Sequence, residues 1–154
     1  MTDSERTPGQ TVRPLIRVRQ YRQFTDEPVS DNEIGAIVDA ARWSGSSRNS
    51  QPWRFIVIRD RDVLRKLHDV GLPQTRSLAT ALSAIAIVVP DEDSDDGDAI
   101  SYAYDEGRAA ERMLIAASFL RLGAGIAWLL PKHRPLAGYL LAIPAGWMVM
   151  LAGT

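Results

Sequence analysis

The longest run of helical periodicity in this 154-residue chain extends from about Ser101 to Leu122. Apolar residues recur there every three or four positions and therefore share one helix face; they are Tyr102, Ala109, Ala110, Met113, Leu114 and Ala117. Gly123 follows as the predicted stop, because glycine readily takes the left-handed conformation that ends helices. A helix this long must bury its apolar face, so the chain has to supply packed layers around it.

Shorter helical and strand-like runs surround this helix. Helical periodicity predicts helices at about 11–18, 31–43, 62–70 and 135–142, with one or two helical turns at 76–82. Ser30 and Glu33 form a capping-box pattern that marks the start of the second helix. Short apolar runs predict strands at 55–58, 84–89, 125–130 and 147–152. This mixed order predicts one α+β domain over residues 11–154, preceded by a flexible N-terminus at residues 1–10.

Composition excludes several kinds of chemistry. The chain has no cysteine, which excludes disulfides, thiolate catalysis and cysteine-ligated zinc or iron–sulfur sites. His68 and His133 are its two histidines and lie far apart in sequence, so no metal site is expected. A net charge of −1 gives no overall attraction to nucleic acid or anionic membranes. The apolar runs are too short to span a membrane and the N-terminus lacks a signal-peptide core, so we expect a cytoplasmic protein.

Two acidic regions are interpreted as solvated. Residues 91–98 are almost entirely acidic, which predicts a mobile loop, and the calcium-loop alternative lacks the required ligand spacing. A second group of carboxylates, Asp105, Glu106 and Glu111, lies near arginines on the long helix. We expect this group to form a solvated, ion-paired helix face.

A polar turn runs directly into the strand that begins at Phe55. Hydroxyls, main-chain N–H groups and side-chain amides are concentrated in it, on Ser46, Ser47, Asn49 and Gln51. Such groups at a helix-to-strand junction often receive a planar polar ligand. A plain structural turn with the same composition is the alternative.

Basic and aromatic residues add to this pattern. Arginines at positions 17, 19 and 22 offer guanidinium groups that pair with phosphate oxygens, and Gln20 adds an amide donor. An ordinary solvated basic stretch is the alternative. Three tryptophans, Trp43, Trp53 and Trp128, are candidate walls for a planar ring. Tryptophans at the ends of elements more often fill a core or an interface, so we assign them no catalytic role.

Several blocks of sequence occur in an order that resembles the nitroreductase family of flavoenzymes. They are Arg19-Gln20-Tyr21-Arg22-Gln23-Phe24, Glu27-Pro28-Val29, Ala41-Arg42-Trp43, Ser46-x-x-Asn49-x-Gln51-Pro52-Trp53, Asp105-x-Gly107-x-Ala109-Ala110, Leu122-Gly123 and Ile143-Pro144-x-Gly146. The resemblance covers about residues 14–153, and the Asn-x-Gln-Pro-Trp block is its most specific part.

The resemblance implies an FMN-dependent oxidoreductase. Its fold would be an α+β sandwich, with a mainly antiparallel sheet flanked by helices and two chains interlocked as a homodimer around two FMN sites. NADH or NADPH would reduce the flavin, which would then reduce a nitroaromatic, quinone or similar electron-poor small molecule by a ping-pong mechanism. The flavin N5 would carry the chemistry, so no catalytic side chain, metal, membrane or nucleic acid is expected. We expect the dimer contact to include the Met113–Leu114 helix face.

The resemblance also assigns individual residues. Arg19, Gln20 and Arg22 fall on phosphate-binding positions. The turn residues Ser46, Ser47 and Asn49 would face the flavin, with Gln51 adding an amide, from the same chain or from the partner. Leu129 and Leu130 stand where a main-chain N–H of relatives reaches flavin N5.

Three departures from the family pattern predict weaker FMN binding and slower turnover. Leu129-Leu130-Pro131 replaces a glycine-containing segment, and the proline removes one N–H donor. Ala145 replaces a usual glutamate, and relatives continue beyond Thr154 in a tail that adds basic phosphate contacts and wraps the partner. A noncatalytic flavin-binding or scaffold protein of the same fold therefore stays open. So does a module that binds an anionic partner through its N-terminal arginines, although the net charge opposes it.

Overall fold

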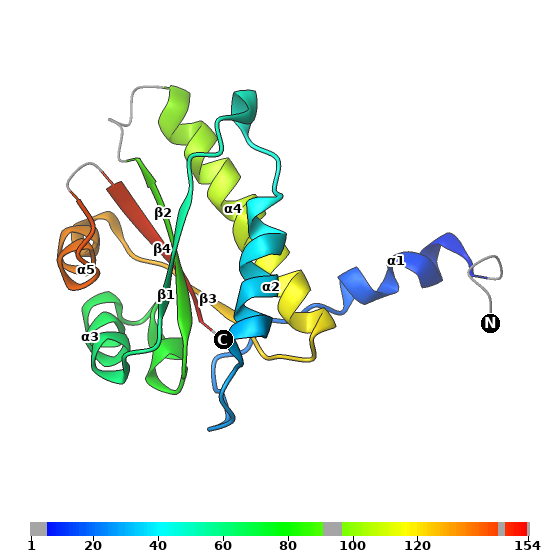
Figure 1. Cartoon of the computed structure of the whole chain (residues 1–154), viewed down its shortest axis with the longest axis horizontal. Helices are drawn as coiled ribbons and strands as arrows, with labels where there is room; N and C mark the ends of the chain where they lie inside the picture. Colours follow the sequence, from blue (N-terminus) through cyan, green and yellow to red (C-terminus); the bar gives the residue numbers. More distant parts are fainter. Residues whose placement is uncertain (1–5, 91–96, 145–146, 154) are drawn as a thin grey trace.

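The computed structural model of the chain describes residues 6–90, 97–144 and 147–153 and has three layers (Figure 1). A four-stranded sheet forms the middle layer. Helices α2 (Asp31–Arg42) and α4 (Gly97–Phe119) cover one face of the sheet, and α3 (Arg61–Gly71) and α5 (Arg134–Leu140) cover the other. This arrangement confirms the predicted α+β fold, in which helices flank a central sheet.

Every pairing within the sheet is antiparallel, as predicted. The strands are β1 (Arg54–Ile58), β2 (Ala84–Pro90), β3 (Gly125–Ala127) and β4 (Trp147–Gly153), and their order across the sheet is β1-β2-β4-β3. The C-terminal strand β4 therefore lies between β2 and β3. β1 and β3 form the two edges.

Successive side chains of a strand point to opposite sides of the sheet, and helices cover both sides of strand β2. The β-branched residues Ile85, Ile87 and Val89 belong to the core beneath α2 and α4. Ala84, Ala86 and Val88 belong to the core beneath α3 and α5. None of these six side chains is more than 3% exposed. The sheet thus separates two hydrophobic cores.

Local signals set the starts of two helices. The Ser30 hydroxyl accepts a hydrogen bond from the Glu33 N–H (3.3 Å), and the Glu33 carboxylate accepts one from the Ser30 N–H (2.9 Å), which confirms the predicted capping box. A matching box formed by Thr7 and Gln10 starts α1 (Pro8–Ile16). That helix therefore begins three residues earlier than the sequence predicted, and the boundary that we placed after residue 10 falls inside it.

The end of α4 differs from the prediction. The helix stops at Phe119, and Arg121 takes the left-handed conformation (φ 62°) in place of the expected Gly123. The Leu122 N–H then closes the end with a hydrogen bond to the Ala117 carbonyl (2.9 Å). At its other end α4 already begins at Gly97, and the rest of the acidic stretch, with the calcium alternative, lies outside the described residues.

Strand β3 is also shorter than predicted. It ends at Ala127, because Pro131 begins a short 3-10 turn (Pro131–His133) and residues 128–130 become a connection.

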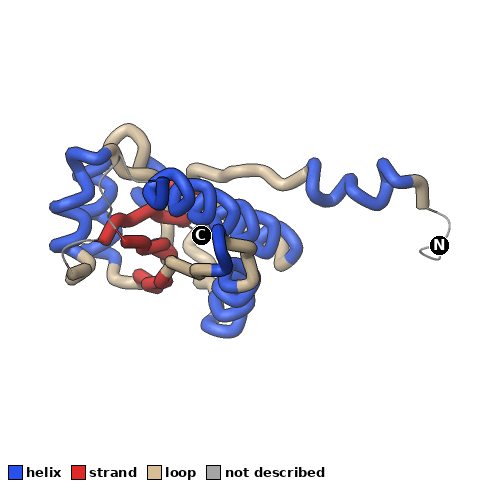
Figure 2. The backbone as a smooth tube through the Cα atoms, turned by 90° about the horizontal axis from the view of Figure 1, so that it is seen from above, coloured by secondary structure: helices blue, strands red, loops and turns tan. Residues whose placement is uncertain are grey.

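Helix α1 stands away from the three layers in both views (Figures 1 and 2). None of its residues is buried, and Val12, Leu15 and Ile16 are 46%, 50% and 67% exposed. A nine-residue helix is marginal in water when it packs against nothing. Within the part of the chain that the structure describes, no helix has both the length and the apolar character needed to cross a membrane.

Candidate functional site

The segment between α1 and α2 runs in an extended course along the start of β3. The Tyr21 N–H donates to the Ala124 carbonyl (2.8 Å), and the Ile126 N–H donates to the Gln20 side chain (3.3 Å). A Cβ on Gly125 would overlap the Tyr21 carbonyl, so this close approach of two main chains requires glycine. These contacts fix the position of the predicted phosphate-binding residues.

The predicted phosphate residues face two different cavities, because side chains of an extended segment alternate in direction. Arg19 lines a cavity of about 500 Å³ together with Arg17 and Tyr21, which we call the Tyr21 cavity. Gln20 and Arg22 line a second cavity of about 490 Å³, which we call the Trp128 cavity. The structure therefore brings Gln20 and Arg22 together and places Arg19 on the other side.

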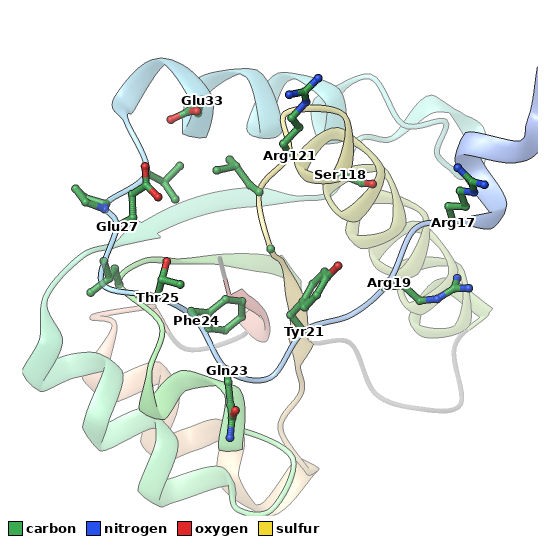
Figure 3. Close-up of a pocket in the computed structure, with 15 residues that line it drawn as sticks. Arg17, Arg19, Tyr21, Gln23, Phe24, Thr25, Glu27, Glu33, Ser118 and Arg121 are labelled. Carbon is green, nitrogen blue, oxygen red and sulfur yellow. The ribbon is translucent and has the colours of Figure 1, made fainter.

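The Tyr21 cavity carries charges of both signs. Figure 3 shows Arg17 and Arg19 at one end and Glu27 and Glu33 at the other. The Arg19 guanidinium donates to the carbonyls of residues 16 and 18, at 2.8 and 3.1 Å. Mixed charge of this kind gives no clear preference for an anionic group.

The Trp128 cavity suits a ligand with an anionic end and a flat end. Arg22 and Arg76 supply two guanidinium groups, and Gln20 and Gln74 supply amides. Trp128 is 48% exposed and lines the same cavity beside Ile126, offering an apolar surface. Sequence reasoning missed Arg76, because it lies in a 3-10 turn after α3 with no periodic or motif signal.

Leu129 and Leu130 follow directly on Trp128. The Leu129 side chain is 3% exposed and belongs to the core beneath α3 and α5. A ligand in the Trp128 cavity can therefore meet Leu129 only through its main chain. The other two tryptophans do not line the Trp128 cavity. Trp53 is buried in the core beneath α2 and α4, and Trp43 is 78% exposed at the end of α2.

The Ser46–Gln51 turn is a strained segment. Three residues without the freedom of glycine take left-handed conformations there: Arg48 (φ 51°), Asn49 (φ 55°) and Gln51 (φ 47°). Each such conformation costs about 1–3 kcal/mol, and strain of this kind concentrates at functional sites.

Hydrogen bonds inside the turn hold its polar groups together. The Ser46 hydroxyl accepts from the Gln51 N–H (2.9 Å), and the Gln51 side chain donates to Asn49 Oδ1 (3.3 Å). The Ser47 N–H leaves the turn and donates to Oδ2 of Asp105 on α4 (3.0 Å). The four predicted turn residues thus form one unit attached to α4.

One chain does not bring the turn and the Trp128 cavity together. The turn meets α4 at Asp105, whereas the segment from Arg17 to Val29 lies at the other end of α4, beside Ser118. Thirteen residues of helix separate these two points, a distance of about 20 Å. The two groups of predicted site residues therefore belong to different places on the chain, as Figure 1 also shows.

The acidic residues of α4 correct the prediction of a solvated face. Asp105 and Glu106 are 2% and 6% exposed, whereas Glu111 is exposed as expected. Burial raises the pKa of Glu106 to about 7, and the charge of Arg134 opposes this shift in part. Glu106 is therefore a buried acid that titrates near neutral pH.

The Met113–Leu114 face, expected at a dimer contact, is buried inside the chain. Both side chains are at most 3% exposed and pack in the core between α4, α2 and the sheet. The exposed large apolar residues described on α4 are instead Ile100, Tyr104 and Phe119, and Leu120 follows directly after the helix. The prediction for this face was wrong, because periodicity identifies an apolar face but not the partner that covers it.

The chain is similar in sequence to several known proteins. A protein of Archaeoglobus fulgidus, provisionally named NADH dehydrogenase/NAD(P)H nitroreductase, is 34% identical over 116 residues, which are 72% of this chain and 62% of that protein. The chain spans 54% to 64% of the length of this relative and of those from Methanothermobacter thermautotrophicus and Thermus thermophilus.

Two solved structures share the architecture. A provisionally named nitroreductase of Desulfovibrio desulfuricans, in complex with FMN, is 27% identical with a TM-score of 0.75 and covers 96% of this chain and 85% of its own. An FMN-dependent nitroreductase of Clostridium difficile has a TM-score of 0.80 at 23% identity, covering 91% and 83%. The family model described as the nitroreductase family matches residues 17–152. With this match over most of its length, the chain belongs to the nitroreductase family.

Proposed function

We propose that this chain is an FMN-dependent oxidoreductase that uses NADH or NADPH to reduce a small electron-poor acceptor, such as a nitroaromatic or a quinone. The composition of the Trp128 cavity carries the proposal. Two guanidinium groups, two amides and a half-exposed indole lie around one space of about 490 Å³. The names of the FMN-bound and FMN-dependent family members support it.

The residues around this cavity fit the two unlike ends of FMN. Arg22 and Arg76 would bind the phosphate through paired hydrogen bonds, and Trp128 with Ile126 would lie against the ring. Arg19 remains a phosphate candidate, although its guanidinium would have to leave the carbonyls that it now contacts. When bound, FMN supplies the redox chemistry by accepting hydride from NAD(P)H and passing electrons to the acceptor.

The active form in this proposal is a homodimer. A two-fold partner would bring its Ser46–Gln51 turn to the Trp128 cavity, which the turn of the same chain does not reach. It would also cover the exposed apolar side chains of α1. Because NAD(P)+ would leave before the acceptor enters the same face, steady-state kinetics should show the parallel lines of a ping-pong mechanism.

Titration of the FMN-free chain with FMN tests the assignment of the cavity. R22A and R76A should each weaken binding by about 10- to 100-fold, because each removes a charge-assisted hydrogen bond to phosphate. The matched control is R65A, since Arg65 is an exposed arginine that pairs with Asp62 on α3, away from the cavity. Affinities equal to that of R65A in both variants would contradict the phosphate site.

A noncatalytic flavin-binding protein is the second candidate. It is favoured by Pro131, which begins a 3-10 turn and offers no N–H donor in the segment that follows Trp128. Both readings predict FMN binding. Reduction of the bound flavin by NADH or NADPH separates them.

A further inference from the structure

Three side chains on one side of α4 contact the main chain that follows α2. Asp105, Arg108 and Arg112 are spaced three and four residues apart and therefore share a helix face. Asp105 accepts the Ser47 N–H, and the Arg112 guanidinium donates to the Trp43 carbonyl. The Arg108 guanidinium lies against Gly45, where an added Cβ would overlap it. We call these three residues the α4 anchor.

Asp105 is the centre of the α4 anchor. Its side chain is 2% exposed, and its Oδ1 lies 3.6 Å from Nη1 of Arg108. A buried carboxylate is unfavourable unless hydrogen bonds and an opposite charge compensate for the lost water. The Ser47 N–H, 3.0 Å from Oδ2, is part of that compensation. A turn that moved away from α4 would leave the buried carboxylate without this donor.

The turn itself requires such support. Its three left-handed residues are strained, and strained main chain persists only where the surroundings hold it. The bonds from Gln51 to Ser46 and to Asn49 join turn residues to one another and not to the rest of the fold. The α4 anchor attaches one side of the turn to the body of the fold, and buried Trp53 follows the turn on the other side.

We propose that Asp105, Arg108 and Arg112 are positioning residues that hold the Ser46–Gln51 turn in its left-handed conformation and so fix the geometry with which it meets the flavin. The part that concerns the flavin rests on the proposed function. The part that concerns the turn does not, because the contacts are present in the chain alone.

Hydrogen exchange of the FMN-free chain tests the turn directly. The main-chain amides of Asn49, Ser50 and Gln51 donate hydrogen bonds within the turn, and that of Ser47 donates to Asp105, so a peptide that covers all four reports the order of the turn. D105A should speed exchange of this peptide at least tenfold. D105N should restore most of the protection, since the amide oxygen still accepts an N–H bond.

Two further variants complete the test. R112A removes an exposed side chain and its bond to Trp43, so it should loosen the turn without the risk of unfolding a buried site. E111A changes an exposed acid on the same helix and is the matched control, with exchange expected to equal that of the wild type. Peptides from α3 should exchange at wild-type rates in every variant.

FMN titration of the same variants tests the link to the flavin. D105A and R112A should weaken FMN binding at least tenfold, whereas D105N and E111A should stay within about twofold. Unchanged exchange in D105A and R112A would overturn the proposal, as would faster exchange with unchanged FMN affinity. A wild-type chain that binds no FMN would overturn the proposed function and the flavin part together, while the exchange result alone would still decide what holds the turn.

Discussion

At the scale of single residues, Glu106 is buried although the sequence predicts an exposed position for it. It lies on α4 among charged residues, yet it is 6% exposed, and its Oε1 has no hydrogen-bond partner among the residues that the structure describes. Burial disfavours the charged form and raises its pKa to about 7 from the ordinary 4.5. The folded chain therefore takes up a proton at a pH at which the unfolded chain has already released it.

This shift predicts how stability depends on pH. A carboxyl whose pKa is raised in the folded state costs nothing well below pH 4.5, where it is neutral in both states. It destabilises the fold increasingly as pH rises from about 4.5 to about 7, and the effect levels off above that. The limit is about 3 kcal/mol at higher pH. E106Q, which resembles the neutral acid, should match the wild type near pH 4.5 and exceed its free energy of unfolding by up to this amount at about pH 8.

Urea unfolding of E106Q at several pH values measures the effect. E111Q is the control, because Glu111 is an exposed acid on the same helix. A difference between E106Q and the wild type that stays constant with pH would count against a buried acid that titrates near neutrality.

At the scale of elements, features that depend on neighbouring residues could be predicted from the sequence. Features that depend on tertiary contacts could not. The start of α2 followed from Ser30 and Glu33, because a capping box lies within four residues of sequence. The end of α4 was misassigned, since Arg121 and not Gly123 takes the left-handed conformation. The same limit applies to the site: charge spacing on α4 gave no indication that Asp105 meets the main chain of Ser47, which is 58 residues away.

The contact between α4 and the turn makes a further prediction. G45A places a methyl group against the Arg108 guanidinium, which is the flexible end of a long side chain, so the cost should be about 1 kcal/mol or less. In an R108A background the same change meets no guanidinium and should cost nearly nothing. Urea unfolding of the two single variants and the double variant measures this interaction. Strictly additive effects would show that Arg108 does not pack on Gly45.

At the scale of the whole molecule, the chain exposes apolar surface that its own layers do not cover. Val12, Leu15 and Ile16 lie on a helix that stands off from the body, and Phe119 and Leu120 lie at the end of α4. The Ser46–Gln51 turn meets α4 at Asp105, about 20 Å along the helix from Ser118, where the segment that carries Arg22 passes. A two-fold dimer would explain both features.

Sedimentation equilibrium tests this assembly. The double variant V12S/I16S should raise the dimer dissociation constant at least 100-fold, because a two-fold contact loses each apolar side chain twice and each is worth about 1 kcal/mol when half-buried. Y139S is the control. Tyr139 is 81% exposed on α5, which covers the face of the sheet opposite α2 and α4 and lies away from α1. A wild-type chain that is monomeric at micromolar concentration and still holds FMN tightly would contradict the dimer.

Anaerobic stopped-flow absorbance of the FMN-loaded chain tests the central claim most directly. The chain need only hold the ring, leave its reactive face open and stabilise the reduced form, so NADH or NADPH should bleach the flavin band, and a quinone or nitroaromatic should restore it. The loss of an N–H donor at Pro131 predicts slow turnover. A flavin band that stays unchanged at millimolar NADH and NADPH, in protein shown to hold FMN, would contradict the assignment of an oxidoreductase.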